Sequence, residues 1–256
     1  MKSTQAQAGF FKRSAMSLRV VLSAMSMLGL IAVTPYAAAA EPAAKPQVFG
    51  GKTYEWGKLL PEQIEVFKLT GNIENGKEAF RGCRGCHKAD AGGLLDGTYP
   101  RLTGQHASVV IKQVTEVRAG IRVNPKMEPF SNDHAVTPQE IADIAVYVES
   151  LQTTRENGKG SGQALARGKA LYDGGNCASC HGQFGEGKAS MAYPVIAAQH
   201  YGYLVREMEY IQKGIRGNSH PKMVKAIEKY TREDIEAVSD YISRMPDYRL
   251  AAQAKK

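Results

Sequence analysis

The second half of this 256-residue chain repeats the first, and each copy holds two cysteines followed at once by a histidine. The two phrases are RGCRGCH, residues 81–87, and GGNCASCH, residues 174–181. Together they contain every cysteine of the chain: Cys83, Cys86, Cys177 and Cys180. A shift of 94 positions also aligns TYPRLTGQH, residues 98–106, with AYPVIAAQH, residues 192–200. The repeat predicts two similar small units of about 85 residues each.

Each unit is expected to be helical. Thr137 followed by a proline and by Glu140 is typical of a helix start, and Thr231 opens an equivalent helix in the second unit. The apolar residues that follow recur at helical spacing. Gly120 and Gly214 are expected to end one further helix each. No segment alternates as a half-buried strand does, so an all-α fold is predicted, with further helices over 74–82, 105–119, 163–173 and 199–213.

The first forty residues have the order of a secretory signal peptide. Four basic residues and no acid precede or flank an apolar core, Val20–Val33, and three alanines end the segment before Glu41. A spanning helix needs about 20 apolar residues, and this core has 14 before a proline. Cleavage is therefore expected. A retained membrane anchor is the alternative, and it alone would give membrane association. Either outcome places the functional part in the periplasm.

The remaining chain divides by composition. Residues 153–163, TTRENGKGSGQ, are rich in glycine, serine and charge, which indicates a flexible linker. The predicted domains are a signal peptide over 1–40, an N-terminal extension of unknown role over 41–70, a first domain over 71–152, a second over 164–247 and a tail over 248–256.

Net charge excludes one class of partner. The formal charge is +8, and removal of four basic residues with the signal peptide lowers it to +4. No cluster of basic residues interleaved with aromatic residues appears. Nucleic acid is therefore not an expected partner.

The cysteine spacing favours covalent haem over three other uses. Disulfides are possible in an exported chain. A redox dithiol belongs with a βαβ pattern that is absent here, and a zinc ribbon separates its cysteine pairs by about 15–20 residues rather than by the 91 positions seen here. In Cys-x-x-Cys-His both thiols add to the vinyl groups of a porphyrin, and the histidine binds its iron. We therefore expect two haem c groups, with His87 and His181 as iron ligands.

The other face of each iron needs a second ligand. Asn-Pro-Lys-Met, ending at Met127, resembles His-Pro-Lys-Met, ending at Met223, and each follows a Gly-Ile-Arg segment. Methionine opposite histidine is an established haem pairing, so these two are the predicted ligands. Met191, Met208 and Met245 are interpreted as packing residues instead.

Histidine is the alternative for this second position. His106 and His200 are equivalent in the repeat and are expected at a haem edge or in solvent, although ligation stays open. His220 lies close enough to Met223 to compete with it. His134 has no counterpart in the other unit.

Four further residues recur near the predicted sites. Pro100 and Pro194 each follow the iron histidine by 13 positions, and their carbonyls could accept the imidazole N–H. Arg122 and Arg216 could pair with haem propionates, although solvated arginines are an equal alternative.

The two units together resemble the dihaem cytochrome c4 family, that is, tandem class I cytochrome c domains. The resemblance covers residues 71–247 and rests on GKEAFRGCRGCH, GKALYDGGNCASCH, the two Pro-Lys-Met segments and TPQEIADIAVYVESL. It implies two facing helical domains, each wrapped around one haem, with iron bound by His87 and Met127 and by His181 and Met223. Family members carry electrons in the periplasm, often toward terminal oxidases. Residues 41–70 have no match in the family.

The function expected is electron transfer between a donor and an acceptor protein of a respiratory chain, without catalysis. The rival is a haem enzyme, either a dihaem peroxidase or a thiosulfate-oxidising cytochrome, which needs an open iron position. A third possibility is a dedicated electron-accepting subunit of such an enzyme.

Overall fold

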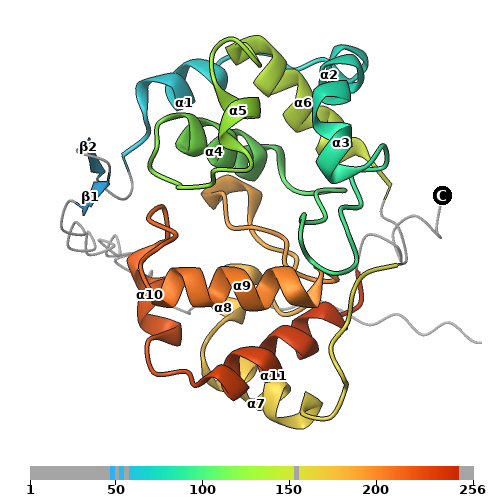
Figure 1. Ribbon diagram of the computed structural model, residues 1–256, viewed down its shortest axis with the longest axis vertical. Coiled ribbons are helices and arrows are strands. Elements are labelled where there is room, and N and C mark those ends of the chain that lie inside the picture. The colour runs from blue at the N-terminus through green and yellow to red at the C-terminus, as the bar shows by residue number, and fades with distance from the viewer. Residues whose placement is uncertain (1–46, 50–51, 55–57, 153–155, 248–256) are drawn as a thin grey trace, which may run out of the picture. The chain divides into compact units, whose positions relative to one another are not determined.

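Helices dominate the described part of the protein. The computed structural model describes residues 47–49, 52–54, 58–152 and 156–247, and we call 58–152 the first half and 156–247 the second half. The first half contains α1 (Pro61–Val66), α2 (Ile73–Ala79), the 3-10 turn η1 (Phe80–Cys83), α3 (Arg84–His87), α4 (Ala107–Arg118), α5 (Glu128–Ser131) and α6 (Pro138–Ser150) (Figure 1). The second contains α7 (Leu165–Gly174), α8 (Ala178–His181), η2 (Ala189–Met191), α9 (Tyr201–Gln212), α10 (Pro221–Ile227) and α11 (Arg232–Ser243).

Local sequence signals set the ends of the two longest helix pairs. At the start of α6 the Thr137 side chain accepts from the Glu140 N–H, and the Glu140 carboxylate accepts from the Thr137 N–H at 2.8 Å. Thr231 and Asp234 form the same reciprocal cap on α11. The predicted helices over 105–119 and 199–213 are α4 and α9, each followed by a glycine with positive φ. The helical prediction is confirmed at these positions.

Each half is built on one close helix crossing. α2 packs on α6, and α7 packs on α11. A Cβ atom at Gly76 would lie 2.0 Å from the Asp143 carbonyl oxygen, and one at Gly168 would lie 2.1 Å from the Ala237 carbonyl oxygen. Only glycine lets the helix backbones approach this closely.

Replacing Gly168 by alanine is expected to destabilise the second half by about 1–3 kcal/mol, because the added methyl group meets backbone that cannot turn aside. Gly174→Ala is the matched control in the same helix, since no heavy atom lies within 4 Å of its added Cβ. Thermal unfolding of the haem-loaded protein measures both. Equal melting temperatures for the two variants would contradict the close approach of α7 to α11 at Gly168.

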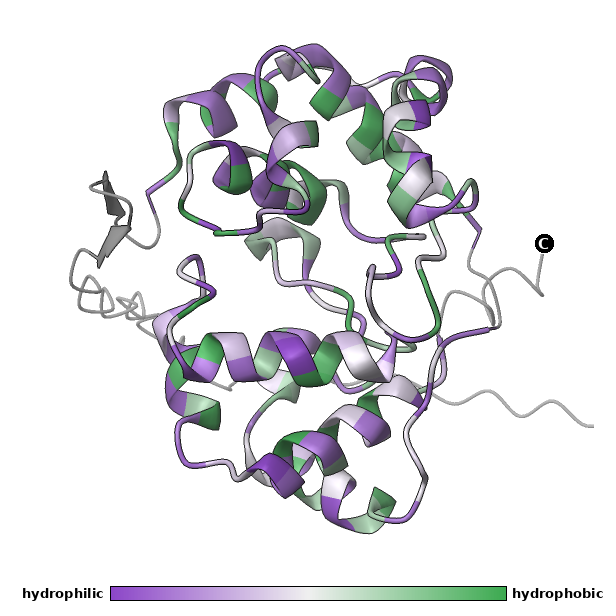
Figure 2. Cartoon of the chain, viewed as in Figure 1, coloured by the Kyte–Doolittle hydropathy of each residue, from purple (hydrophilic) through white to green (hydrophobic). Residues whose placement is uncertain are grey.

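Apolar side chains form one core in each half. The first gathers Phe80 with α4 and α6, and the second gathers Tyr172 with α9 and α11. Figure 2 shows hydrophobic and hydrophilic residues interspersed along these helices. Met208 and Met245 are buried in the second core, as predicted. The prediction for Met191 as a packing residue is wrong, because its side chain is exposed.

Residues 58–70 of the predicted N-terminal extension belong to the first half and pack on its helices. Val66 of α1 is fully buried in the first core, and the Gln63 amide donates to the Thr115 hydroxyl of α4 at 3.1 Å. Glu62 forms an ion pair with Arg118, also on α4. Residues 61–66 therefore cover the α4 side of this half.

The all-α prediction is confirmed for the two domains, and one short hairpin precedes them. β1 (Gln47–Phe49) pairs antiparallel with β2 (Lys52–Tyr54), with Val48 opposite Thr53. Gly50 and Gly51 stand between them in the sequence, and a two-glycine connection is typical of a β-hairpin.

The predicted linker is not a loose connector over its described part. The buried Asp240 carboxylate accepts from the Gly160 N–H at 3.0 Å and from the Gly162 N–H at 2.6 Å. The Asn157 amide donates to the Ser243 carbonyl at 2.7 Å. A Cβ at Gly158 would lie 1.7 Å from the Leu95 carbonyl oxygen. Glycine is present here for close backbone approach as well as for freedom, which composition alone does not distinguish.

The predicted signal peptide (1–40), the tail (248–256) and Trp56 lie outside the described residues. In the residues that are described, no helix has the length and hydropathy required for a membrane span. The described residues belong to one compact unit, 42–256.

Candidate haem sites

Each Cys-x-x-Cys-His motif ends in a histidine held by a backbone carbonyl. His87 ends α3 and His181 ends α8, where the next residue turns to positive φ and stops the helix. The His87 Nδ1 lies 3.2 Å from the Pro100 oxygen, and the His181 Nδ1 lies 3.2 Å from the Pro194 oxygen. The structure thus brings together the residues that the spacing of 13 positions suggested.

Burial favours the neutral form of both imidazoles. It lowers the pKa of His87 and of His181 below the ordinary histidine value, and the proline carbonyls oppose this only in part. A carbonyl accepts only from N–H, so the proton stays on Nδ1. The lone pair of Nε2 is then left for a metal.

The thiols are half-buried and unpaired. Burial raises the pKa of Cys83 to about 11 and the pKa of Cys177 to about 11. A thiol in such surroundings is better suited to an uncharged thioether than to a thiolate. Within the described residues no group of three or more histidine, cysteine, aspartate or glutamate side chains is placed to hold a metal ion, so a zinc-ribbon cluster is not formed there.

A tyrosine beside each proline connects the histidine side of the site to the methionine segment. The Tyr99 ring lies 6.3 Å from the His87 ring, and the Lys126 Nζ lies 5.6 Å from the Tyr99 centroid. In the second half the Tyr193 ring lies 6.3 Å from the His220 ring. Both Pro-Lys-Met segments therefore lie next to the loop that carries the proline. The two tyrosines were not singled out from sequence, although the repeat aligns them.

The two methionines occupy different local structures. Met127 is the half-buried N-cap of α5, whereas Met223 lies within α10 and packs against the second core. His220 is the N-cap of α10, and its Nδ1 accepts from the Lys222 N–H at 3.0 Å. That ring nitrogen is used locally by the helix.

Arg122 and Arg216 meet in a polar cluster shared by both halves. The Arg122 guanidinium lies 2.7 Å from the Gln113 Oε1 and 3.2 Å from a Glu207 oxygen. The Arg216 guanidinium lies 2.8 Å from Glu207 and 3.2 Å from Gln113. Gln113 and Glu207 are equivalent in the repeat, so each arginine bonds one residue of its own half and one of the other.

The charge of this cluster suits further anions. Among the described residues, Lys112 pairs with Glu116 at 2.5 Å, and Arg122 and Arg216 both pair with Glu207, so three cations share the carboxylates of Glu116 and Glu207. Haem propionates are anions of this kind. Histidines whose Nδ1 is held by a carbonyl, thiols without a disulfide bond and a cationic cluster together fit one haem c in each half. The residues that would hold the two groups are Cys83, Cys86 and His87 in the first half and Cys177, Cys180 and His181 in the second.

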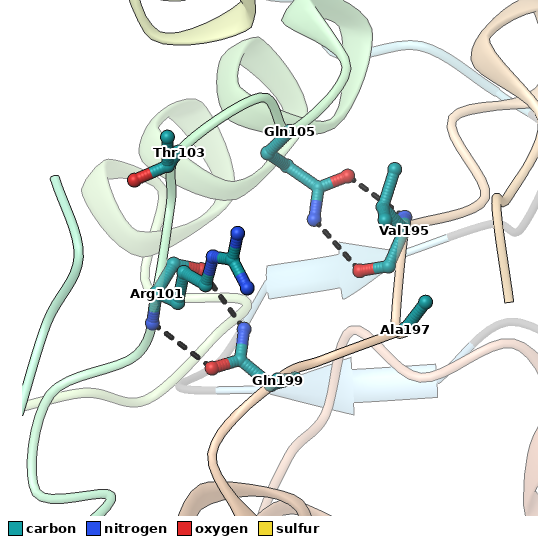
Figure 3. A pocket seen from close by; sticks show the side chains of 6 residues that line it. All are labelled: Arg101, Thr103, Gln105, Val195, Ala197 and Gln199. Carbon is teal, nitrogen blue, oxygen red and sulfur yellow. Dashed lines mark hydrogen bonds between the residues drawn. The ribbon is translucent and has the colours of Figure 1, made fainter. Parts of the chain in front are cut away.

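Two glutamines join the halves, and Figure 3 shows them with their partners. The Gln105 Oε1 accepts from the Val195 N–H at 2.9 Å, and its Nε2 donates to the Val195 oxygen at 3.0 Å. Gln199 binds the Arg101 N–H and carbonyl in the same way, at 2.9 Å each. The cavity between these side chains is only about 10 Å³. The glutamines precede the histidines of the aligned phrases but were not predicted to have a role.

His106 and His200 also join the halves, and the burial of His200 corrects its expected position in solvent. The His106 Nε2 lies 2.9 Å from the Glu186 oxygen, and the His200 Nε2 lies 2.7 Å from the Gly92 oxygen. His200 is fully buried, and its Nδ1 accepts from the Gly158 N–H at 3.0 Å. Both nitrogens of His200 are thus used by backbone groups.

Two helical units, each with a haem-attachment motif and a proline-held histidine, define a dihaem c-type cytochrome. The family model described as Cytochrome c matches twice, over residues 73–152 and 165–246. A cytochrome c4 of Pseudomonas aeruginosa is 30% identical over 200 residues, which span 72% of this chain and 97% of that protein. The chain belongs to the cytochrome c family and, within it, to the dihaem cytochrome c4 family, and it carries two covalently bound haem c groups.

Two further comparisons support this assignment. The crystal structure of a reduced recombinant cytochrome c4 from Pseudomonas stutzeri matches with a TM-score of 0.63 and 25% identity, over 69% of this chain and 100% of that one. A thiosulfate dehydrogenase electron acceptor of Stutzerimonas stutzeri is 30% identical over 176 residues, which span 65% of this chain and 80% of that protein. The protein is a dihaem electron carrier that passes electrons between redox partners.

Proposed function

We propose that the protein carries single electrons in the periplasm, from a donor protein toward a respiratory chain, through two irons bound by His87 with Met127 and by His181 with Met223. The observation that carries the proposal is the repeated 3.2 Å contact between histidine Nδ1 and proline oxygen, which leaves each Nε2 on the side of the ring away from that carbonyl. The same contact in both halves favours two working centres.

The residues have separate roles in this function. Bound haem c supplies one reversible Fe(III)/Fe(II) couple in each half. Pro100 and Pro194 fix the orientation of the histidines by accepting their N–H, which also raises the basicity of the ligand nitrogen. Met127 and Met223 would hold the iron by a thioether, which would favour Fe(II) and raise the reduction potential. Arg122 and Arg216 would hold the propionates by charge-assisted hydrogen bonds.

Closed iron positions also separate a carrier from an enzyme. A peroxidase or a thiosulfate-oxidising haem must admit its substrate to the metal, and a methionine ligand in each half prevents this. We therefore propose that the chain is not itself an enzyme.

The decisive measurement is the spectrum of the purified haem-loaded protein. The oxidised form should show the weak far-red methionine–iron band for both haems, and the reduced form should not bind carbon monoxide. High-spin iron or carbon monoxide binding at either haem would refute carrier function through two closed sites.

The identity of the partners gives a second candidate. One relative is named thiosulfate dehydrogenase electron acceptor, and this favours a donor that oxidises thiosulfate. In the respiratory alternative, the donor is a quinol-oxidising complex and the acceptor is a terminal oxidase. Stopped-flow reduction by a thiosulfate-oxidising enzyme and by a quinol-oxidising complex distinguishes the two donors. Electron transfer contacts are small and transient, and salt screens the exposed charges that form them. The rates of reduction should therefore depend on ionic strength.

The periplasmic location rests on the sequence of residues 1–40. Mass spectrometry of exported protein should find a mature chain that begins after Ala40 and carries the added mass of two haems. A chain that retains the apolar segment would instead support the membrane-anchored alternative.

A further inference from the structure

The peptide group that holds each iron histidine is itself held by the opposite half. The Pro100 oxygen is bonded by His87, and the nitrogen of the same peptide group, that of Arg101, donates to Gln199 of the second half. One planar amide therefore accepts a hydrogen bond from a haem ligand and donates one across the interface.

The second half repeats this arrangement with the roles reversed. The Pro194 oxygen is bonded by His181, and the N–H of Val195, in the same peptide group, donates to Gln105 of the first half. The four residues that make these cross-contacts are all buried: Arg101, Gln105, Val195 and Gln199. Each glutamine also donates to the carbonyl of the residue it holds, so it keeps a fixed orientation.

Hydrogen bonds that share an amide strengthen one another. An amide whose N–H is already donated carries more negative charge on its oxygen, so that oxygen becomes a better acceptor. A better acceptor draws the Nδ1 proton of the histidine more strongly and makes the Nε2 atom a stronger electron donor. Stronger donation stabilises Fe(III) and lowers the reduction potential.

We propose that Gln105 and Gln199 are positioning residues that act crosswise: Gln199 of the second half sets the potential of the His87 haem, and Gln105 of the first half sets the potential of the His181 haem. The inference rests on the proposed histidine–methionine ligation. It gives the buried interface a redox role beyond holding the halves together.

The crossed pattern distinguishes this role from simple packing. A glutamine that only joined the halves would affect both haems alike when removed, because the loss of one contact loosens one shared interface. A relay through one peptide group affects the haem of the opposite half first. Near-isosteric methionine removes both hydrogen bonds of the glutamine while it fills a similar volume.

The experiment is a redox titration of haem-loaded Gln199→Met and Gln105→Met proteins followed by NMR. The methyl signals of ligated Met127 and Met223 in the reduced state report on each haem separately. In Gln199→Met the ratio of reduced to oxidised His87 haem at fixed ambient potential should rise about threefold or more, which is at least about 28 mV for a one-electron couple. In Gln105→Met the His181 haem should show this rise, and in each variant the other haem should change less.

Ser108→Ala is the matched control, because the Ser108 hydroxyl also crosses the interface, to the Ala189 carbonyl at 2.6 Å, but touches neither peptide group. It should leave both potentials unchanged. Equal shifts of both haems in each glutamine variant, or no shift in either, would overturn the inference while leaving the carrier function intact. Absence of the methionine methyl signals from the unmodified protein would instead refute the ligation itself.

A measurement on the unmodified protein covers the case in which a variant does not take up haem. The amide protons of Arg101 and Val195 should exchange with solvent only on global opening, because the glutamines hold them inside the interface. Fast exchange at both amides would show that the relay does not form and would overturn the inference.

Discussion

Replacing Cys177 and Cys180 together by serine is expected to yield a protein with one haem and an unfolded second half. The second core is small, and a covalently held porphyrin supplies much of the apolar surface that a unit of this size otherwise lacks. Without the thioether links His181 has no metal to bind. Mass spectrometry should show the loss of one haem, and far-UV circular dichroism should show a large loss of helix.

The reciprocal variant, Cys83→Ser with Cys86→Ser, serves as the control for position in the chain. It should also lose one haem, but from the first half, whose core is extended by Val66 of α1. We expect the first half to keep more helix than the second half does. Full helicity of the second half without its haem would contradict the dependence of folding on the cofactor.

Replacing Met223 by alanine is expected to open one iron and to change its potential strongly. The thioether favours Fe(II), so its loss should lower the potential of the His181 haem by more than about 59 mV, a tenfold change in the reduced-to-oxidised ratio. The opened position should bind carbon monoxide in the reduced state. Spectroelectrochemistry measures the change in potential, which should affect one haem per chain. Carbon monoxide titration measures the opened position, which should bind one molecule per chain.

Met191→Leu is the control for this variant, because Met191 belongs to the same half and its side chain is 54% exposed. It should leave the spectrum and both potentials unchanged. If Met223→Ala kept a six-coordinate low-spin iron, another side chain would be the ligand, and His220, the N-cap of the same helix, would be the first to test.

The sequence predicts those features that depend on local spacing. The attachment motifs follow from covalent chemistry, and the contact of His87 with Pro100 was suggested by a separation of 13 residues that recurs in the second unit. The caps at Thr137 and Thr231 follow from side chains that bond their own helix starts. Each of these features is set within one unit, so a repeat in the sequence is enough to reveal it.

Features that depend on how the two units meet could not be predicted in this way. His200 looks like a surface residue in its own helix pattern, but its side chain is buried and its Nε2 donates a hydrogen bond to the Gly92 carbonyl of the opposite half. Gln199 is an ordinary polar residue before a helix until Arg101 of the other unit is placed against it. Gly158 looks like a flexible connector residue, although the Leu95 carbonyl leaves no room for a side chain.

The symmetry of the glutamine contacts has a consequence for the origin of the chain. Each unit contributes one glutamine to the interface and binds one glutamine of the other unit. A single-haem ancestor with this surface would therefore have bound a second copy of itself through two identical contacts, as two-fold homodimers do. Joining the copies in one polypeptide makes that encounter independent of protein concentration. The two copies differ at this contact: Arg101 stands where the aligned position has Val195, and it forms an ion pair with Asp247 at 3.0 Å that the uncharged Val195 cannot form.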